Sequence, residues 1–296
     1  MNNTSRARLN VIISMVIYGT IGLFVRNISL PSSVTSMVRA IIGAPFLLLV
    51  LAVKKQKLDI DSIKRNLRYL IISGALLGFN WILLFEAYRY TTVATATLGY
   101  YFAPIIIVAL SPVLFKERLT LKKVLCVLAA LLGMFFVSGV ASNGVLKLSE
   151  LKGILLSLGA ACFYAAIVIT NKQLKDISAY DRTVFQLALS AVLLIPYNLI
   201  TGSFAGCSLD GLSLIMLLIL GIVHTGIAYL LYFGSMDALP SQTLAIVSYI
   251  DPVVAVLVSA LILRENVGLG EFLGAGLILG AAIISELPEK VGKGLK

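Results

Sequence analysis

Four ionisable residues lie inside long apolar segments of the chain: Arg39, Glu86, His224 and Asp251. A charge at the centre of a bilayer costs about 2.5–3.5 kcal/mol on insertion scales, so such residues mark paths for solutes or ions. Asp251 stands near the middle of the apolar segment 240–263, directly before Pro252. Proline removes one helical hydrogen bond and frees a carbonyl about one turn earlier. A carboxylate beside this loosened backbone suits a proton or a cationic group, and the alternative is a structural pair with another polar side chain.

His224 is the only histidine and lies within the apolar segment 213–233. An imidazole titrates near neutral pH, so His224 could exchange protons alongside Asp251. The alternative is a neutral ring that donates one hydrogen bond between helices. Asn80 and Trp81 occupy the middle of segment 68–88. We expect both to contact a solute, and Asn80 could instead tie two helices together.

Arg39 and Glu86 lie about two turns or less from the same membrane surface, on neighbouring apolar segments. Opposite charges inside a membrane usually pair with one another. The sequence therefore predicts an ion pair between Arg39 and Glu86. The alternative is a gate on the outer side that breaks and re-forms during transport.

Several tyrosines lie too deep in the apolar segments to belong to an aromatic belt at the lipid headgroups. They are Tyr18, Tyr100, Tyr101, Tyr164, Tyr229 and Tyr249. Rings at this depth can stack on an organic solute and attract a cationic one, and ordinary packing is the alternative. We assign Tyr101 and Tyr249 to the solute site.

The composition requires a membrane environment for these residues. Of 296 residues, 59% are hydrophobic and only 13% are charged, with a mean hydropathy of +0.99. Soluble domains are roughly 45–50% apolar and about 25% charged. The fold class is therefore an all-α integral membrane protein with ten transmembrane helices, since ten segments approach the roughly 20 residues that cross a bilayer. They are 9–25, 33–53, 68–88, 93–115, 120–139, 152–171, 183–202, 213–233, 240–263 and 268–286. The longest polar stretch, 54–66, suffices only for a surface helix or loop.

The positive charges predict the orientation. If the chain crosses the membrane an even number of times, 18 of the 24 Lys and Arg residues lie on the same side as the N-terminus. Five lie on the other side, and Arg39 lies inside a span. Cytoplasmic loops carry such an excess, so we expect a multi-pass protein of the cell (plasma or inner) membrane with both termini cytoplasmic. Because these charges lie between apolar segments, the net charge of +10 does not indicate a nucleic-acid partner.

The second half of the chain repeats the first. Pro252 and Glu265 follow Pro104 and Glu117 at the same offset of 148 residues, which also carries Tyr101 onto Tyr249. We expect one five-helix repeat over 1–140 and a second over 150–288. An odd number of spans inverts the second copy, and inverted repeats with a site near the midplane are typical of transporters. Pro104 and Pro252 are expected to let their helices bend.

The chain lacks the motifs of other function classes. It has no phosphate-binding loop and no His, Cys or Asp cluster at metal spacing, so we expect no cofactor and no metal. Its three cysteines, Cys126, Cys162 and Cys207, form no disulfide pattern. The energy for transport would come from a gradient. The glycine-rich helix 268–286 predicts close helix packing, within a monomer or across a homodimer.

These features resemble the EamA-like, ten-span members of the drug/metabolite transporter superfamily. A proline, an apolar run and Lys or Arg before Glu occur twice, from Pro104 to Glu117 and from Pro252 to Glu265. Tyr18-Gly19 in the first span, its weaker echo Tyr164-Ala165 in the sixth, and the placement of Arg39 also fit. The resemblance covers nearly the whole chain and implies a transporter of amino acids, sugars, other metabolites or drugs, in either direction.

We therefore expect a secondary transporter, not an enzyme, that moves a small organic metabolite such as an amino acid or a related compound. Alternating access with ion or proton coupling is the expected mechanism. An exporter of toxic compounds or drugs and a non-transporting membrane receptor are the alternatives. The expected partners are the small-molecule substrate and the lipid bilayer.

Overall fold

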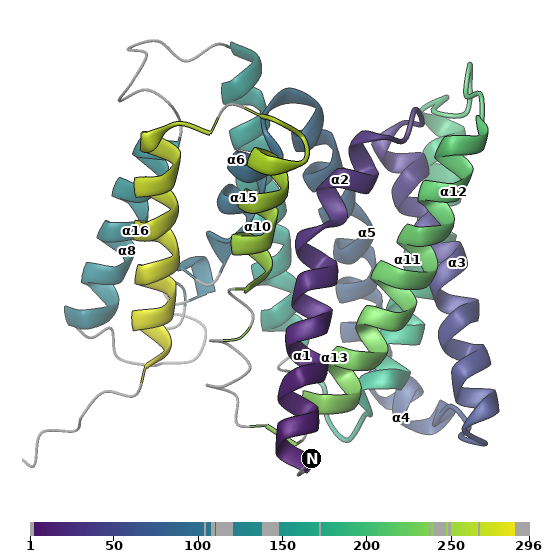
Figure 1. The fold of residues 1–296 in the computed structure, drawn as a ribbon. Helices are drawn as coiled ribbons and strands as arrows, with labels where there is room; N and C mark the ends of the chain where they lie inside the picture. Colours follow the sequence, from purple (N-terminus) through teal and green to yellow (C-terminus); the bar gives the residue numbers. More distant parts are fainter. Residues whose placement is uncertain are drawn as a thin grey trace, which may run out of the picture.

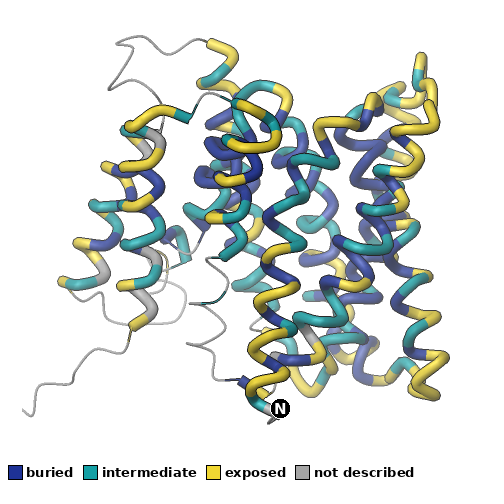
Figure 2. The backbone as a smooth tube through the Cα atoms, viewed as in Figure 1, coloured by how far each residue is buried: buried dark blue, intermediate teal, exposed yellow. Residues whose placement is uncertain are grey.

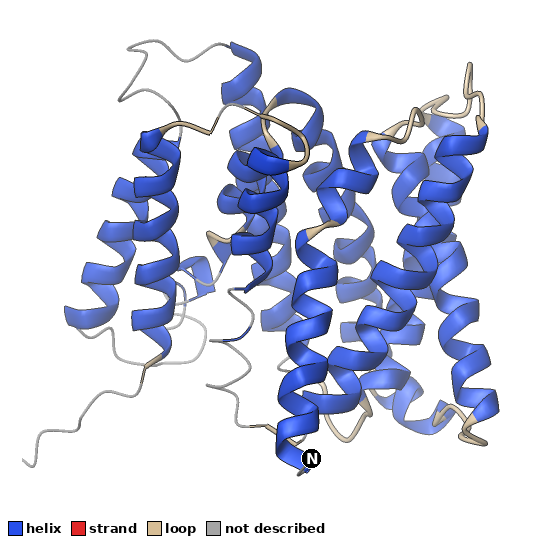
Figure 3. Cartoon of the chain, in the orientation of Figure 1, coloured by secondary structure: helices blue, strands red, loops and turns tan. Residues whose placement is uncertain are grey.

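The computed structural model describes residues 3–103, 105–107, 110, 121–137, 148–171, 173–236, 238–239, 247, 250–265 and 267–287. Within these ranges the regular secondary structure is entirely helical (Figure 3). An all-helical membrane protein, as the composition predicted, is confirmed.

The helices follow the ten predicted apolar segments. The first half holds α1 (Asn3–Gly19), α2 (Ile21–Arg26), α3 (Ser32–Val53), α4 (Ile60–Arg65), α5 (Leu67–Tyr90), α6 (Val93–Tyr100) and α8 (Leu121–Val137). The second half holds α10 (Leu148–Asn171), α11 (Ala179–Ile200), α12 (Gly211–Ile219), η1 (Leu220–Ile227), α13 (Ala228–Met236), α15 (Ile250–Leu261) and α16 (Leu269–Glu286). Six helical stretches are long and apolar enough to cross a membrane, and shorter apolar helices fall in the other four segments. The short α4 occupies the polar stretch 54–66, as expected.

Helices from the two halves pack against each other (Figure 1). α5 packs on α10 and α11, α3 packs on α11 and η1, and α1 packs on α13 and α15. We call the end of the bundle that holds the α2–α3 connection and the start of α12 the distal face, because it lies opposite the N-terminus (Figure 1). Polar groups between these helices are therefore shared by both halves.

The largest apolar core lies among α3, α5, α11 and the helices beside them, where the buried residues gather (Figure 2). Trp81, Phe85 and Leu187 belong to it. Helices α8 and α16 pair at one side of the bundle and keep many large apolar side chains exposed, among them Leu125 and Phe272. This exposure fits contact with lipid.

The glycines of α16 differ in their surroundings. A methyl group added to Gly133 of α8 would lie 2.8 Å from the carbonyl oxygen of Gly274, so these helices approach closely within one chain. Methyl groups on Gly276 and Gly280 would meet no atom of another helix within 4 Å. A methyl group on Gly270 would lie 3.3 Å from the Phe136 carbonyl oxygen of α8, so the close packing of this helix occurs at Gly270 and Gly274.

Candidate functional site

The first predicted span is interrupted at Thr20, between α1 and α2. The Thr20 hydroxyl donates to the Ile17 carbonyl at 2.7 Å and lies 3.0 Å from Nε2 of His224. A methyl group on Gly19 would lie 2.6 Å from the Asp251 carbonyl oxygen, so α15 packs directly on the interruption. Broken helices at membrane depth are tolerated where they are buried in protein or line a cavity, and in transporters they form binding sites.

The eighth span contains a π-helix, η1, whose wider turn carries His224 and Thr225. The Thr225 hydroxyl donates to the Leu220 carbonyl at 2.9 Å, five residues earlier. Methyl groups added to Gly221 and Gly226 would lie 2.4 Å and 2.2 Å from side-chain atoms of α3, which brings α3 and η1 unusually close. π-helical turns occur frequently at functional sites.

Arg39 reaches η1 across this close contact. Its Nε donates to the Thr225 hydroxyl at 2.6 Å, and only 3% of the residue is exposed. The guanidinium carbon lies 4.2 Å from the ring centroid of Trp81 and 5.7 Å from that of Phe85. Within the described part of the chain no carboxylate pairs with it. A buried guanidinium held by a hydroxyl and two aromatic faces is short of negative charge.

Asp251 is the second charged group of the site. It lies in the described part of α15 and accepts a hydrogen bond of 2.7 Å from the Tyr101 hydroxyl. Pro252, the next residue, is buried in the same helix, and its role in bending that helix stays a prediction. Tyr249 and Pro104, which the sequence placed in the site and at a helix bend, lie outside the described residues.

Asn80 and His224 make different kinds of contact. The Asn80 side-chain amide donates to the Ala160 carbonyl at 2.6 Å and joins α5 to α10. Its Oδ1 has no hydrogen-bond donor among the described residues, although the Tyr100 hydroxyl lies nearby. His224, besides meeting Thr20, lies edge-on to Phe24 with ring centroids 4.9 Å apart. Asn80 thus ties two helices together, whereas His224 belongs to the polar group at the α1–α2 interruption.

The expected ion pair between Arg39 and Glu86 is not formed. Glu86 accepts a hydrogen bond of 2.6 Å from the Ser32 hydroxyl and lies 3.5 Å from Arg89. Ser32 begins α3, and Arg39 follows seven residues later, about 10 Å further along the axis at 1.5 Å per residue. The two charges therefore lie about two helical turns apart in depth, and the pairing prediction was wrong.

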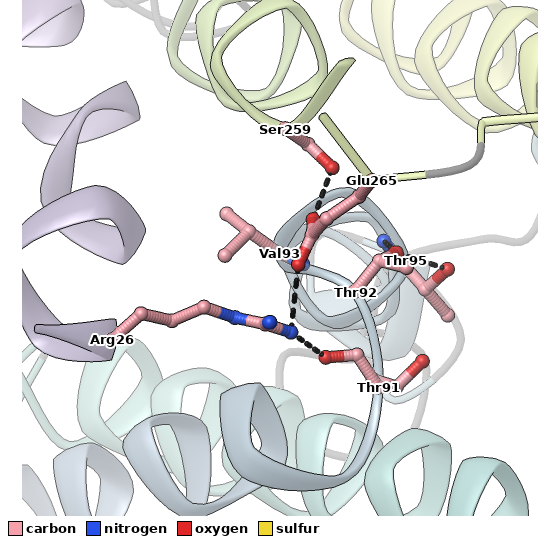
Figure 4. A network of polar contacts seen from close by, with 7 residues as sticks. All are labelled: Arg26, Thr91, Thr92, Val93, Thr95, Ser259 and Glu265. Atoms are coloured by element: carbon pink, nitrogen blue, oxygen red, sulfur yellow. Dashed lines mark hydrogen bonds and ion pairs between the residues drawn. The ribbon is translucent and has the colours of Figure 1, made fainter. Parts of the chain in front are cut away.

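A different ion pair joins the two halves at the distal face (Figure 4). Arg26 at the end of α2 lies 2.7 Å from Oε1 of Glu265, for which it is the sole polar partner in the described residues. Oε2 of Glu265 accepts the Val93 backbone N–H at 2.9 Å, and it also accepts the Ser259 hydroxyl. Arg26 donates in addition to the Thr91 carbonyl. We call the contacts of Arg26, Val93 and Ser259 with Glu265 the distal latch.

A cavity of about 300 Å³ opens beside the latch. Its wall includes the hydroxyl residues Ser32 and Thr35 and the rings of Phe85 and Tyr88, with Arg26 and Arg89 also lining it. Thr35 stands four residues before Arg39 on α3, so both project from one face. Phe85 contacts the cavity and also lies beside the Arg39 guanidinium. The cavity thus reaches to within one turn of Arg39.

Sequence reasoning missed three parts of this site: the contacts of Thr20, the contacts of Thr225 and the central position of Arg39. Gly19-Thr20 and Thr225-Gly226 each combine a hydroxyl with a glycine inside an apolar segment. That combination favours an irregular helix, since a hydroxyl can bond back to the backbone and a glycine admits a neighbour.

Comparisons with known proteins agree with this architecture. One solved crystal structure matches this chain with a TM-score of 0.67 at 19% sequence identity. The match covers 94% of this chain and 96% of that chain, which shows a shared fold. An uncharacterized transporter of Bacillus subtilis (strain 168), YxxF, is 32% identical over 98% of this chain and 92% of its own length. An uncharacterized transporter of Archaeoglobus fulgidus is 27% identical over 93% and 94% of the two chains.

The sequence pattern of one family matches twice, over residues 6–139 and 151–286. It is described as the EamA-like transporter family, and these two ranges cover most of the chain. Together with the relative that is 32% identical over nearly the full length, this match establishes the family. The protein belongs to the EamA-like transporter family of the drug/metabolite transporter superfamily.

Proposed function

We propose that the protein is a secondary carrier that moves a small organic metabolite, an amino acid or a related compound, by alternating access with proton or ion coupling. One observation carries this proposal. Three polar contacts of the site, Tyr101 with Asp251, Thr20 with His224 and Arg39 with Thr225, each join a residue of one half to a residue of the other. Any rocking of the halves would change the site and its access together.

The distal latch supports alternating access. Arg26 and Val93 belong to the first half, and Ser259 and Glu265 belong to the second. An ion pair with one partly exposed partner can exchange its contacts for water when the halves separate, because its net strength is modest. The latch thus takes the gating role that the sequence assigned to Arg39 and Glu86.

The membrane, orientation and assembly follow from the same proposal. The excess of Lys and Arg places the N-terminal side in the cytoplasm, so the distal face would be extracellular or periplasmic in a plasma or inner membrane. The open face at Gly276 and Gly280 leaves room for a second copy, and a homodimer through α16 would use it. The names of the relatives, which are transporters, support a carrier over an enzyme.

Flux through purified protein in liposomes tests the proposal. A panel of radiolabelled amino acids, and separately a panel of cationic drugs, is offered to vesicles that enclose a pH-sensitive dye. We expect saturable uptake of at least one amino acid accompanied by a change in internal pH. Drug flux alone would favour the toxic-compound exporter, and binding without any exchange across the bilayer would favour a receptor.

A further inference from the structure

The short helix α4 and the start of α5 form one two-faced element at the end of the bundle that holds the N-terminus (Figure 1). The helical hydrogen bonds continue across the junction at Asn66, whose N–H donates to the Ser62 carbonyl and whose carbonyl accepts the Leu70 N–H. Residues three or four positions apart therefore share a face. The buried face holds Ser62, Ile63, Asn66 and Leu70. The exposed face holds Ile60, Lys64, Leu67, Arg68 and Ile71.

Hydrogen bonds hold the buried face in place. The Asn66 side-chain amide donates to the Lys175 carbonyl at 2.8 Å, and its Oδ1 accepts the Lys175 backbone N–H at 2.9 Å. These two bonds tie the junction of α4 and α5 to the connection between α10 and α11. The Asp59 carboxylate caps α4 by accepting the backbone N–H groups of Asp61 and Ser62. The exposed face therefore has a defined position on the bundle.

The exposed face lies at the level of a membrane surface. The 24 residues of α5 rise about 36 Å at 1.5 Å per residue, which exceeds the roughly 30 Å of a hydrocarbon core. Leu67 and Arg68, at the start of α5, therefore reach the level of the lipid headgroups. Ile71 and Ile72, one turn further on, are exposed large apolar side chains that fit contact with acyl chains. Lys64 and Arg68 thus stand at the polar edge of a lipid-facing surface, where long basic side chains extend toward the headgroups.

The charge of this region is strongly positive. Residues 54–68 include six Lys and Arg residues and two Asp residues, a net charge of +4. All six basic residues are exposed, and none of them forms an ion pair with a carboxylate of the described residues. One of the two carboxylates, that of Asp59, is engaged in capping α4. Clusters of basic residues beside a membrane span attract anionic lipids.

We propose that Lys64 and Arg68 bind the headgroup of an anionic phospholipid whose acyl chains lie along Leu67 and Ile71. An acidic soluble protein would match the two charges alone, whereas a phospholipid matches both the charges and the exposed apolar side chains of the same face. The bound lipid stabilises the folded protein by mass action. This inference requires only that the chain is embedded in a membrane, so it stands apart from the proposed carrier function.

Lipid titration of the wild-type protein is the first test. The purified protein in a neutral detergent is titrated with phosphatidylglycerol, with phosphatidylcholine and with sn-glycerol 3-phosphate, which has the phosphate and no acyl chains. We expect phosphatidylglycerol alone to raise the melting temperature, and the gain should shrink as salt screens the charges. Equal stabilisation by phosphatidylcholine would show that the negative charge does not matter, and equal stabilisation by glycerol phosphate would show that the acyl chains do not. Either result would overturn the inference.

A pair of double variants locates the binding site. In Lys64→Gln/Arg68→Gln we expect phosphatidylglycerol to bind about 30-fold more weakly, and native mass spectrometry should find one fewer molecule retained than in the wild type. The lipid-free melting temperature should not change, since both side chains are exposed. Arg6→Gln/Arg8→Gln removes two exposed charges from α1 at the same end of the bundle and should bind the lipid as the wild type does. Equal losses in the two double variants would mean that net charge alone attracts the lipid, and that result would overturn the inference. If Lys64→Gln/Arg68→Gln does not fold, the lipid titration of the wild type still decides.

Discussion

At the scale of single residues, the contact of Tyr101 with Asp251 is the point where coupling is expected. The hydroxyl belongs to the first half of the chain and donates to a carboxylate of α15 in the second half. A proton or a cationic group of the solute would compete for the same oxygen atoms. Loss of the charge should therefore affect coupling and flux together.

Asp251→Asn should lower saturable flux about 30-fold or more, the effect expected for removing a buried charged partner. Asparagine keeps the shape and can still accept the Tyr101 hydroxyl, so the fold should be retained. The measurement is initial uptake in proteoliposomes together with internal pH. Tyr101→Phe, which keeps the carboxylate and removes one hydrogen bond, should lose only about 3- to 10-fold. Wild-type flux from Asp251→Asn would remove Asp251 from the mechanism.

The sequence singled out ionisable residues that the structure places between helices of the two halves, and it assigned Arg39 and Glu86 the wrong partners. Arg39, His224 and Asp251 could be found because a charge or an imidazole in an apolar segment is rare. The pairing of Arg39 with Glu86 failed because it relied on depth counted along each segment. The cation–π contact with Trp81 and the hydroxyl of Thr225 depend on how α3 packs against α5 and η1. No spacing within one segment reveals that packing.

At the scale of elements, irregular helices position the site. The α1–α2 interruption and the π-helix η1 place Thr20, His224 and Thr225 side by side. Apolar length predicted where each span lies, since the bilayer requires it. The same length could not show where a span breaks, because the break depends on contacts with other helices.

Gly221→Ala should destabilise the protein, because the added methyl group would lie 2.4 Å from Cβ of Ile42 and would force α3 away from η1. Overpacking of this kind costs about 1–3 kcal/mol. Thermal melting of the purified protein measures the loss. Gly211→Ala in α12 is the matched control, since a methyl group there also meets open space, and its melting temperature should not fall. Equal melting temperatures for the two variants would contradict the close contact.

The start of α12 should respond to acid. Asp210 accepts the Ser213 N–H at 2.6 Å and the Ser29 hydroxyl at 3.1 Å, and these hydrogen bonds hold the pKa of its carboxyl below its ordinary value of 3.8. Because the pKa is lower in the folded state, the stabilisation is complete above the unfolded value and disappears as pH falls through the folded one. We expect wild type and Asp210→Asn to converge in melting temperature as pH falls below about 4. A constant difference down to pH 2 would contradict this assignment.

At the scale of the whole molecule, the distal latch joins the two halves at a place that the proposed alternating access would have to open. Glu265→Gln removes the charge that binds Arg26, and it should increase opening at the distal face about fivefold, the shift that roughly 1 kcal/mol produces. A reporter Ala96→Cys, fully buried one turn below Val93 in α6, is placed in a chain whose Cys126, Cys162 and Cys207 are replaced by alanine. The rate of labelling by a membrane-impermeant maleimide measures the opening.

Glu86→Gln provides the control for the latch. Glu86 lies on the same face, but its partners Ser32 and Arg89 belong to its own half. Labelling of the reporter should stay at the wild-type rate in this variant. Similar acceleration by both substitutions would mean that Glu265 acts through surface charge alone and does not hold the halves together.

Counterflow in proteoliposomes tests the central claim, a carrier that alternates access to one site between its halves. Vesicles are loaded with an unlabelled amino acid that stabilises the purified protein, and uptake of the same labelled compound is followed from outside. We predict transient accumulation above equilibrium that depends on the internal compound and is absent in Asp251→Asn. Uptake that internal substrate does not accelerate, as in a passive channel, would contradict the account.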